Sequence, residues 1–145
     1  MDFFTTSYQE PDTELPEILL NRVINGFSRS TDGIAELSVV EMTNNKYRMN
    51  SVGGTFSFSL VLNSPMIPSY SYTVLDFGYN MSLYPINIRL NQDIASELKL
   101  EEDLFGNHKI GIESEADFLE LLRQVFSTSY FNRTVGGLLK ISKNR

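Results

Sequence analysis

The clearest pattern in this chain is a strict alternation of large apolar residues with smaller ones over positions 55–62. The apolar positions of this segment are Phe56, Phe58, Leu60 and Leu62. Successive side chains of a strand point to opposite faces, so this period of two predicts a strand with one buried face.

Further strands are predicted on both sides of this segment. They cover residues 34–43, Tyr47 to Asn50, 70–77, 83–90 and 109–113. Adjacent Val39 and Val40 interrupt the alternation of the first strand, which allows a bulge or burial on both sides. Gly53-Gly54 permits a bend, and the two prolines within residues 63–68 predict a loop because proline cannot donate to a ladder.

The apolar period changes to that of a helix near the N-terminus. A helix is predicted from about Leu15 to Phe27, with Pro16 in its first turn, where the missing N–H costs nothing. The predicted apolar face consists of Leu15, Ile18, Leu19, Val23 and Phe27. Residues 1–11 show no periodicity, and we expect them to form a loosely held arm.

Three more helices are predicted toward the C-terminus. Asn91 caps a short helix, and Ser114 caps a longer one. The buried stripe of the longer helix is predicted to be Phe118, Leu121, Leu122 and Val125. A last helix spans about residues 131–141 and contains Gly136-Gly137, each costing about 1 kcal/mol relative to alanine. We interpret this pair as allowing close packing against a neighbouring element.

The order of these elements predicts the fold class. Strands that follow one another with short connections favour an antiparallel meander, here of about 5–6 strands. Helices at both ends of the sequence favour an α+β fold in which they pack on one face of the sheet. The 145 residues fit one domain, and the second face of the sheet would remain open.

Composition narrows the function classes. The chain has no cysteine, which excludes disulfides and thiolate chemistry and suits a reducing compartment. Its net charge of −6 opposes nucleic-acid binding, which needs cations to neutralise phosphates. We see no secretory signal and no apolar run near the ~20 residues of a membrane span, so we expect a cytoplasmic protein without a membrane partner.

The charges are unevenly distributed. Residues 1–17 hold five acids and no base, and residues 93–120 hold nine acids and two bases. From Leu121 onward there are five bases and no acid. The acidic segment, which includes Glu101, Glu102 and Asp103, would suit a basic protein partner, although it also serves solubility.

Asp76 is the one charged residue between Met49 and Ile88, a stretch with seven aromatic residues. In an aromatic pocket its pKa would rise, and it would serve as an acid or base. We favour the alternative that Asp76 ends a strand and accepts hydrogen bonds from the turn at Gly78.

The tyrosines around Asp76 are the best binding candidates in the sequence. Tyr70 and Tyr72 should share one face of the sheet, and Tyr79 follows nearby. Tyrosine is enriched at interfaces because it buries area and keeps a polar tip, but it also serves as a core residue with its hydroxyl at the rim.

Neither a metal nor a phosphate site is predicted. Glu101, Glu102 and Asp103 lack the spacing of a calcium loop, and His108 has no neighbour with ligand spacing. The glycine pairs lack the phosphate-loop pattern. We therefore predict no cofactor, no metal and no catalytic residue.

One part of the chain resembles known sequences. The stretch from Tyr84–Leu90 through Glu113–Leu122 resembles parts of small, uncharacterised bacterial proteins, some of which sit in toxin–immunity systems. The resemblance covers about a third of the chain and contains no catalytic signature. The acidic balance and small size of the chain are compatible with an immunity-type inhibitor, which blocks a partner by binding it.

Three functions stay open at this point. The first is a non-catalytic protein-interaction module that uses the tyrosine face or the acidic surface. The second is a small-ligand domain with a pocket lined by Phe56, Phe58, Tyr70 and Tyr72. The third is a hydrolase-like enzyme centred on Asp76. An exposed edge strand would also allow two copies to associate.

Overall fold

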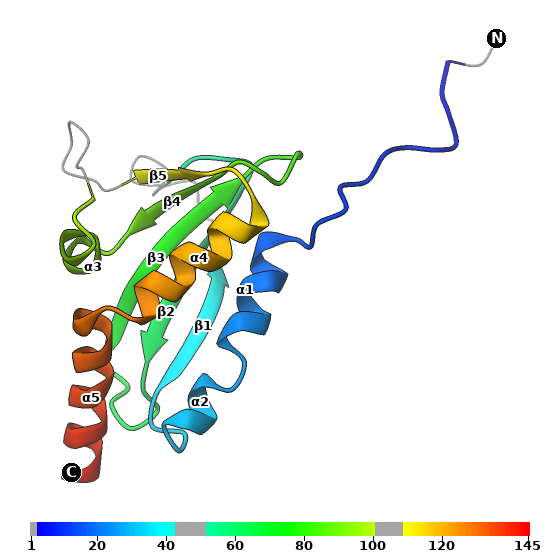
Figure 1. Cartoon of the computed structure of the whole chain (residues 1–145). Coiled ribbons are helices and arrows are strands. Elements are labelled where there is room, and N and C mark those ends of the chain that lie inside the picture. Colours follow the sequence, from blue (N-terminus) through cyan, green and yellow to red (C-terminus); the bar gives the residue numbers. More distant parts are fainter. Residues whose placement is uncertain (1–2, 43–51, 101–108) are drawn as a thin grey trace.

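A computed structural model describes residues 3–42, 52–100 and 109–145. The described strands form one antiparallel sheet in the order of the sequence, β1-β2-β3-β4-β5 (Figure 1). Their bounds are β1 Glu36–Glu41, β2 Phe56–Asn63, β3 Ser71–Tyr79, β4 Ile86–Leu90 and β5 Lys109–Ile112. The stretch between Met49 and Ile88, with Asp76 as its one charged residue, supplies β2, β3 and most of β4 of the sheet. The predicted α+β fold with an antiparallel meander is therefore confirmed.

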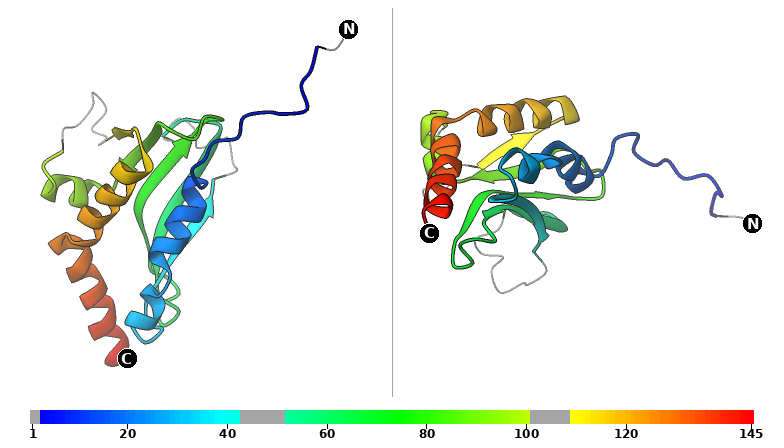
Figure 2. Two further views of the ribbon diagram at one scale, coloured as in Figure 1. Left: turned by 45° about the vertical axis from the view of Figure 1, so that its right-hand side comes forward. Right: turned by 90° about the horizontal axis from the view of Figure 1, so that it is seen from below.

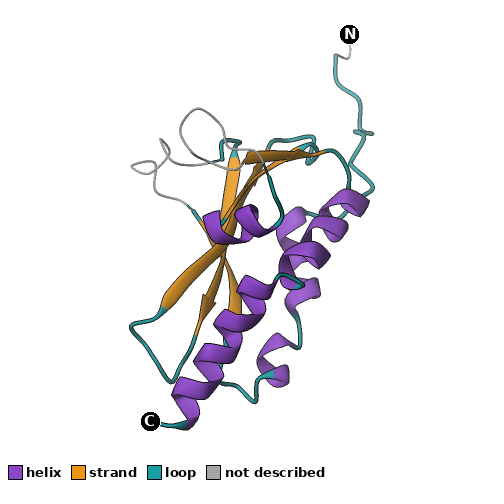
Figure 3. Ribbon diagram, turned by 60° about the vertical axis from the view of Figure 1, so that its left-hand side comes forward, coloured by secondary structure: helices purple, strands orange, loops and turns teal. Residues whose placement is uncertain are grey.

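Helices from both ends of the chain cover one face of this sheet (Figures 2 and 3). They are α1 Pro16–Ile24, α2 Phe27–Ser30, α4 Glu115–Phe126 and α5 Ser129–Lys143, while the short α3 Gln92–Glu97 follows β4. Ser114 caps α4 and Asn91 caps α3 through their side-chain oxygens, as predicted. Capping satisfies N–H groups that have no partner inside the helix.

The core lies between the sheet and these helices. Strand pairing places Phe58 opposite Phe77, and Phe77 opposite Ile88, so that their side chains share the covered face. The Phe77 ring lies 5.2 Å from that of Phe58 and 5.9 Å from that of Phe118 in α4. Full burial of such a side chain contributes about 1.5–3 kcal/mol, so this cluster anchors α4 on the sheet.

The predicted N-terminal helix is correct in position but not in its end or its face. It stops at Ile24, and Gly26, with φ of 94°, redirects the chain so that Phe27 starts α2. Leu20 is fully buried, whereas Ile18 is 50% exposed. The two residues are about 200° apart around the helix, so they cannot share a face.

Two other predictions were wrong. β1 and β2 pair without interruption through Val39 and Val40, and the bulge lies instead in β3, where Leu60 pairs with Leu75 and Val61 with Thr73. The predicted close packing at Gly136 and Gly137 is absent within the described chain: a Cβ at either position would meet no atom within 4 Å.

The glycines near β2 do have neighbours. Gly54 has a φ of 96°, and a Cβ there would lie 2.8 Å from the Tyr79 backbone nitrogen. A Cβ on Gly78 would lie 2.0 Å from the Gly53 carbonyl oxygen. The bend predicted at Gly53-Gly54 therefore packs its backbone directly against β3. The strand predicted at Tyr47 to Asn50 lies outside the described residues.

Residues 3–14 form neither helix nor strand and extend away from the body of the molecule (Figure 1). We call this segment the N-terminal arm. Its aromatic residues Phe3, Phe4 and Tyr8 are 80%, 84% and 70% exposed. Among the described residues, no helix combines the length and apolar character needed to cross a bilayer.

Candidate functional site

The most distinctive concave feature is an apolar groove of about 350 Å³ between the α1–α2 corner and the α4–α5 corner. Figure 1 shows the positions of these four helices. We call it the helical groove. Its apolar walls are Val23, Ile24, Phe27, Leu37, Phe126 and Phe131. Gly26, Ser30 and Asn132 complete the lining.

The groove exists because the core is filled under only one end of α1. Val23 and Ile24 follow Leu19 and Leu20 by one helical turn and therefore share their face. Leu19 and Leu20 are 0% exposed, but Val23 is 37% exposed. The covered face of α1 thus runs from a packed core into an open space.

Three phenylalanines form an aromatic wall in the groove. The ring of Phe131 lies 6.1 Å from that of Phe27 and 5.2 Å from that of Phe126. Thr128 positions Phe131 by accepting a hydrogen bond from its backbone N–H at 3.2 Å, which starts α5 at this place. Rings at these distances favour one another beyond the burial of their area.

A polar hollow adjoins the groove on the other side of Asn132. It is lined by Glu97, Ser129, Asn132 and Arg133. The Glu97 carboxylate accepts hydrogen bonds from the backbone N–H groups of Ser129 and Tyr130 at 2.6 and 2.9 Å. Glu97 thereby satisfies N–H groups at the start of α5, where a negative charge is favourable. Arg133 thus places a cation next to an apolar groove.

The predicted tyrosine face lies on the helix-covered side of the sheet. Tyr72 is opposite the buried Leu62, and its ring is 6.0 Å from that of Tyr130 in α5. Tyr70 lies just before β3 and is partly buried beside them. Burial, helped by the Tyr130 and Asp93 charges, raises the pKa of Tyr72, and burial likewise raises the pKa of Tyr70.

Tyr79 is a core residue of β3. Its hydroxyl donates to the Glu17 carboxylate of α1, with oxygen distances of 2.6 and 2.9 Å. Burial and this carboxylate raise the pKa of Tyr79. Tyr79 therefore ties the sheet to the filled end of α1 and does not face an open surface.

Asp76 is buried in the middle of β3 on the face opposite the helices. Its carboxylate accepts a hydrogen bond from Ser59 Oγ at 2.5 Å and pairs with Arg89 Nη2 at 2.5 Å. A hollow of about 190 Å³ lies beside it, lined by Thr73, Asp76, Arg89 and Asn91 among others. The prediction that Asp76 ends a strand and binds the turn at Gly78 was wrong.

Sequence reasoning missed Arg89 and the helical groove. Arg89 lies directly opposite Asp76 across the β3–β4 ladder, one residue beyond the stretch that carries a single charge. The strand register was the missing information. Phe56 and Phe58, two of the residues predicted to line a ligand pocket, both pack against the ring of Tyr79.

The remaining candidates lie outside the structural description. Glu101, Glu102, Asp103 and His108 fall within residues 101–108, which the structure does not describe. In the part of the chain that it does describe, no three acidic or histidine side chains are grouped so that they could hold a metal ion.

Comparison of the chain with protein-family models, with curated proteins and with solved structures gave no match.

Proposed function

We propose that this chain is a non-catalytic binding module whose helical groove receives an apolar segment of a protein chain. The observation that carries this proposal is the exposure of Val23, which lies on the buried face of α1 but faces open space. Apolar surface exposed in a concavity marks a place where a partner adds burial.

The chemistry of the groove supports a peptide segment with aromatic or aliphatic side chains. Phe27, Phe126 and Phe131 provide aromatic contacts, and Val23 at the edge of the groove is exposed. Binding of an apolar segment between helices is a common recognition mode in proteins. No covalent step is needed for this role.

The contacts of Asp76, on the face of the sheet opposite the helices, support a structural role for this residue more than an enzymatic one. Both carboxylate oxygens of Asp76 are engaged, one by Ser59 and the other by Arg89. A carboxylate held in this way is not available to abstract a proton without breaking a buried ion pair.

A binding module of this kind can act as an inhibitor that blocks its partner, as immunity proteins do. The stretch from Tyr84–Leu90 through Glu113–Leu122 resembles small, uncharacterised bacterial proteins, and the presence of some of these in toxin–immunity systems supports this role. A basic partner would complement the chain's net charge of −6.

A small apolar ligand is the second candidate for the same groove. Its volume of about 350 Å³ lies near the lower end of the range for small-molecule pockets, and its lining is aromatic. Native mass spectrometry of the purified chain would reveal a retained ligand as a defined mass increment, which Val23→Asp should abolish.

Photo-crosslinking tests the main proposal. A photoreactive phenylalanine analogue replaces Val23 in the groove, and a control chain carries it in place of Ile18, which is on the outer side of the same helix. We expect protein adducts in cells from position 23 and not from position 18, with the partner identified by mass spectrometry.

Equal labelling from both positions, or none from position 23, would contradict the proposal. A basic toxin among the adducts would support the immunity role, and its absence among them would remove that role while keeping the binding module.

A further inference from the structure

The N-terminal arm and the helical groove have complementary chemistry. The arm exposes Phe3, Phe4 and Tyr8, and the apolar lining of the groove includes the exposed Val23 and the partly buried Phe27 and Phe126. Neither is satisfied within the described chain. We infer that the arm of one copy docks in the helical groove of a second copy, so that two molecules exchange arms. This inference rests on the proposed function and names its partner.

Charge favours the same pairing. The arm carries Glu10 and Asp12, and α5 carries Arg133, Lys140 and Lys143. None of these five side chains forms an ion pair with another residue in the described ranges. All charged residues of the segment 1–17 are acidic, and all charged residues of 121–145 are basic. An arm lying along α5 would therefore bring opposite charges together.

The spacing of the two surfaces also agrees. Phe4 and Glu10 are six residues apart on the arm, which is about 20 Å of extended chain. Phe131 in the groove and Lys143 are twelve residues apart on α5, which is about 18 Å of helix. An arm with Phe4 in the groove therefore carries its acids toward the basic end of α5.

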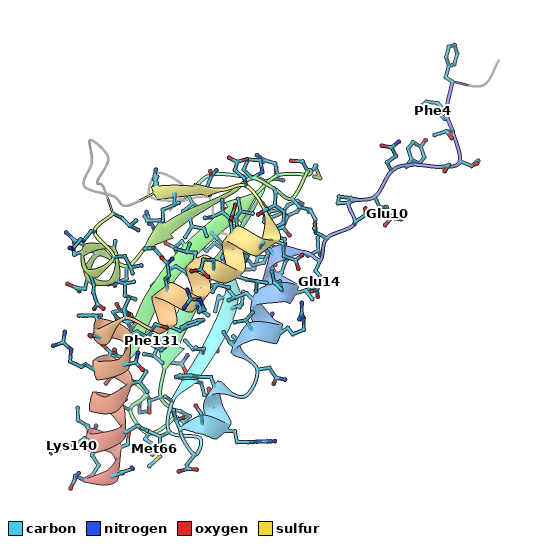
Figure 4. The ribbon with its side chains drawn as sticks, in the orientation of Figure 1. Phe4, Glu10, Glu14, Met66, Phe131 and Lys140 are labelled. Carbon is cyan, nitrogen blue, oxygen red and sulfur yellow. The ribbon has the colours of Figure 1, made fainter. Side chains whose placement is uncertain are left out.

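The direction of the arm argues for a second copy over the chain's own groove. Leu15 is extended, with φ of −59° and ψ of 137°, because it precedes Pro16, and the arm leaves α1 at the end farthest from the groove. Phe4 and Glu10 lie on the opposite side of the molecule from Phe131 and Lys140 (Figure 4). To reach its own groove the arm would have to reverse over the length of α1.

The buried area would suffice for a stable pair. Each aromatic side chain buries about 150–250 Å². Three from each of two arms would bury about 900–1,500 Å² before the groove side is counted, which approaches the size of a standard interface. When two identical copies exchange arms, both grooves are occupied, so the assembly stops at a dimer.

Sedimentation velocity over a range of concentrations tests the exchange with the full chain. We expect a monomer–dimer equilibrium that weakens at high salt. Loss of both anchors in Phe3→Ser/Phe4→Ser, or introduction of a charge in Val23→Asp, should raise the dimer dissociation constant at least about thirtyfold. Thr5→Ala/Thr6→Ala on the arm and Ile18→Asp on the outer side of α1 are the matched controls and should leave it unchanged.

Crosslinking distinguishes exchange from other arrangements. A photoreactive analogue in place of Phe4 should label groove peptides, and mixing heavy-isotope and normal chains should give pairs with one peptide from each. Pairs that never mix isotopes would show that the arm folds onto its own chain and overturn the inference.

A monomer at all concentrations would overturn the inference as well. If position 23 still captures another protein in cells, the binding module stands and only the identity of its partner changes.

Discussion

Leu19 and Val23 lie one turn apart on the same face of α1 and have opposite surroundings. Leu19 is 0% exposed, in a core that includes Leu20, Phe77 and Phe118. Val23 is 37% exposed at the edge of a groove. The end of α1 that carries Leu19 therefore stabilises the fold, whereas the end that carries Val23 remains available for binding.

The difference comes from the connections that flank the helices. At the filled end, α4 crosses the sheet and packs Phe118 on Phe77 at 5.9 Å. At the open end, Gly26 turns the chain into α2 and Thr128 caps the start of α5, so the two corners lie apart over β1. The groove between the helices therefore results from the positions of the turns at Gly26 and Thr128.

Alanine substitution at both positions measures the contrast most directly. Leu19→Ala removes a fully buried side chain and should lower the free energy of unfolding by about 2–5 kcal/mol. Val23→Ala removes a side chain that is already partly hydrated and should cost less than about 1 kcal/mol. Urea unfolding at low protein concentration, followed by circular dichroism, measures both in the monomer. Equal losses there would mean that the groove is filled within a single chain.

The ion pairs allow the same test with charges in place of apolar groups. Arg89→Met leaves the Asp76 carboxylate, 9% exposed, without its cation and should cost about 3 kcal/mol. Arg22→Met breaks the ion pair between Arg22 and Glu14, whose side chains are 62% and 39% exposed, respectively. This change should lower the free energy of unfolding by less than about 1 kcal/mol. The denaturant midpoints of the two variants give the comparison. An unchanged midpoint for Arg89→Met would mean that water reaches the Asp76 carboxylate.

Substitution of two tyrosines measures how far hydrogen bonds stabilise the packed end of α1. Tyr79→Phe removes a donor to the Glu17 carboxylate and should cost about 1–2 kcal/mol. The Tyr84 hydroxyl is buried without a hydrogen-bond partner among the described residues, and burial raises the pKa of Tyr84 to about 12. Tyr84→Phe should therefore be neutral or slightly stabilising. Thermal unfolding at neutral pH separates them, and a costly Tyr84→Phe would reveal a partner for that hydroxyl.

The smallest expected effect concerns α5 beside the open end. Gly137→Ala adds a methyl group that meets no atom within 4 Å and should stabilise the monomer by about 0.5–1 kcal/mol through helix propensity. Unfolding at low protein concentration measures this gain. A loss instead of a gain would show that a second chain packs closely on this face of α5.

Local patterns were sufficient for much of the fold. The alternation at Phe58, Leu60 and Leu62 predicted β2, because the period of side chains in a strand is a property of the strand alone. The stripe from Phe118 to Val125 was predicted correctly for the same reason. The antiparallel order of β2, β3 and β4 followed from the short connections between these consecutive strands.

The candidate site was less predictable. The pairing of Asp76 with Arg89 depends on the register of β3 against β4, which no local pattern specifies. The placement of Tyr72 against Tyr130 depends on where α5 begins. The wrong assignment of Ile18 to the buried face arose because Leu15 and Ile18 lie three residues apart, as neighbours on one helix face do, but that face is exposed.

The sequence by itself thus determined the elements, their order and the charge of their outer faces, because these depend on neighbours within one turn or one strand. Only the tertiary structure decided that Val23, Phe27 and Phe131 line one groove and that the acidic arm stands apart from the basic α5. Those relations join residues far apart in the chain, and they arise from where the turns at Gly26 and Thr128 place the helices on the sheet.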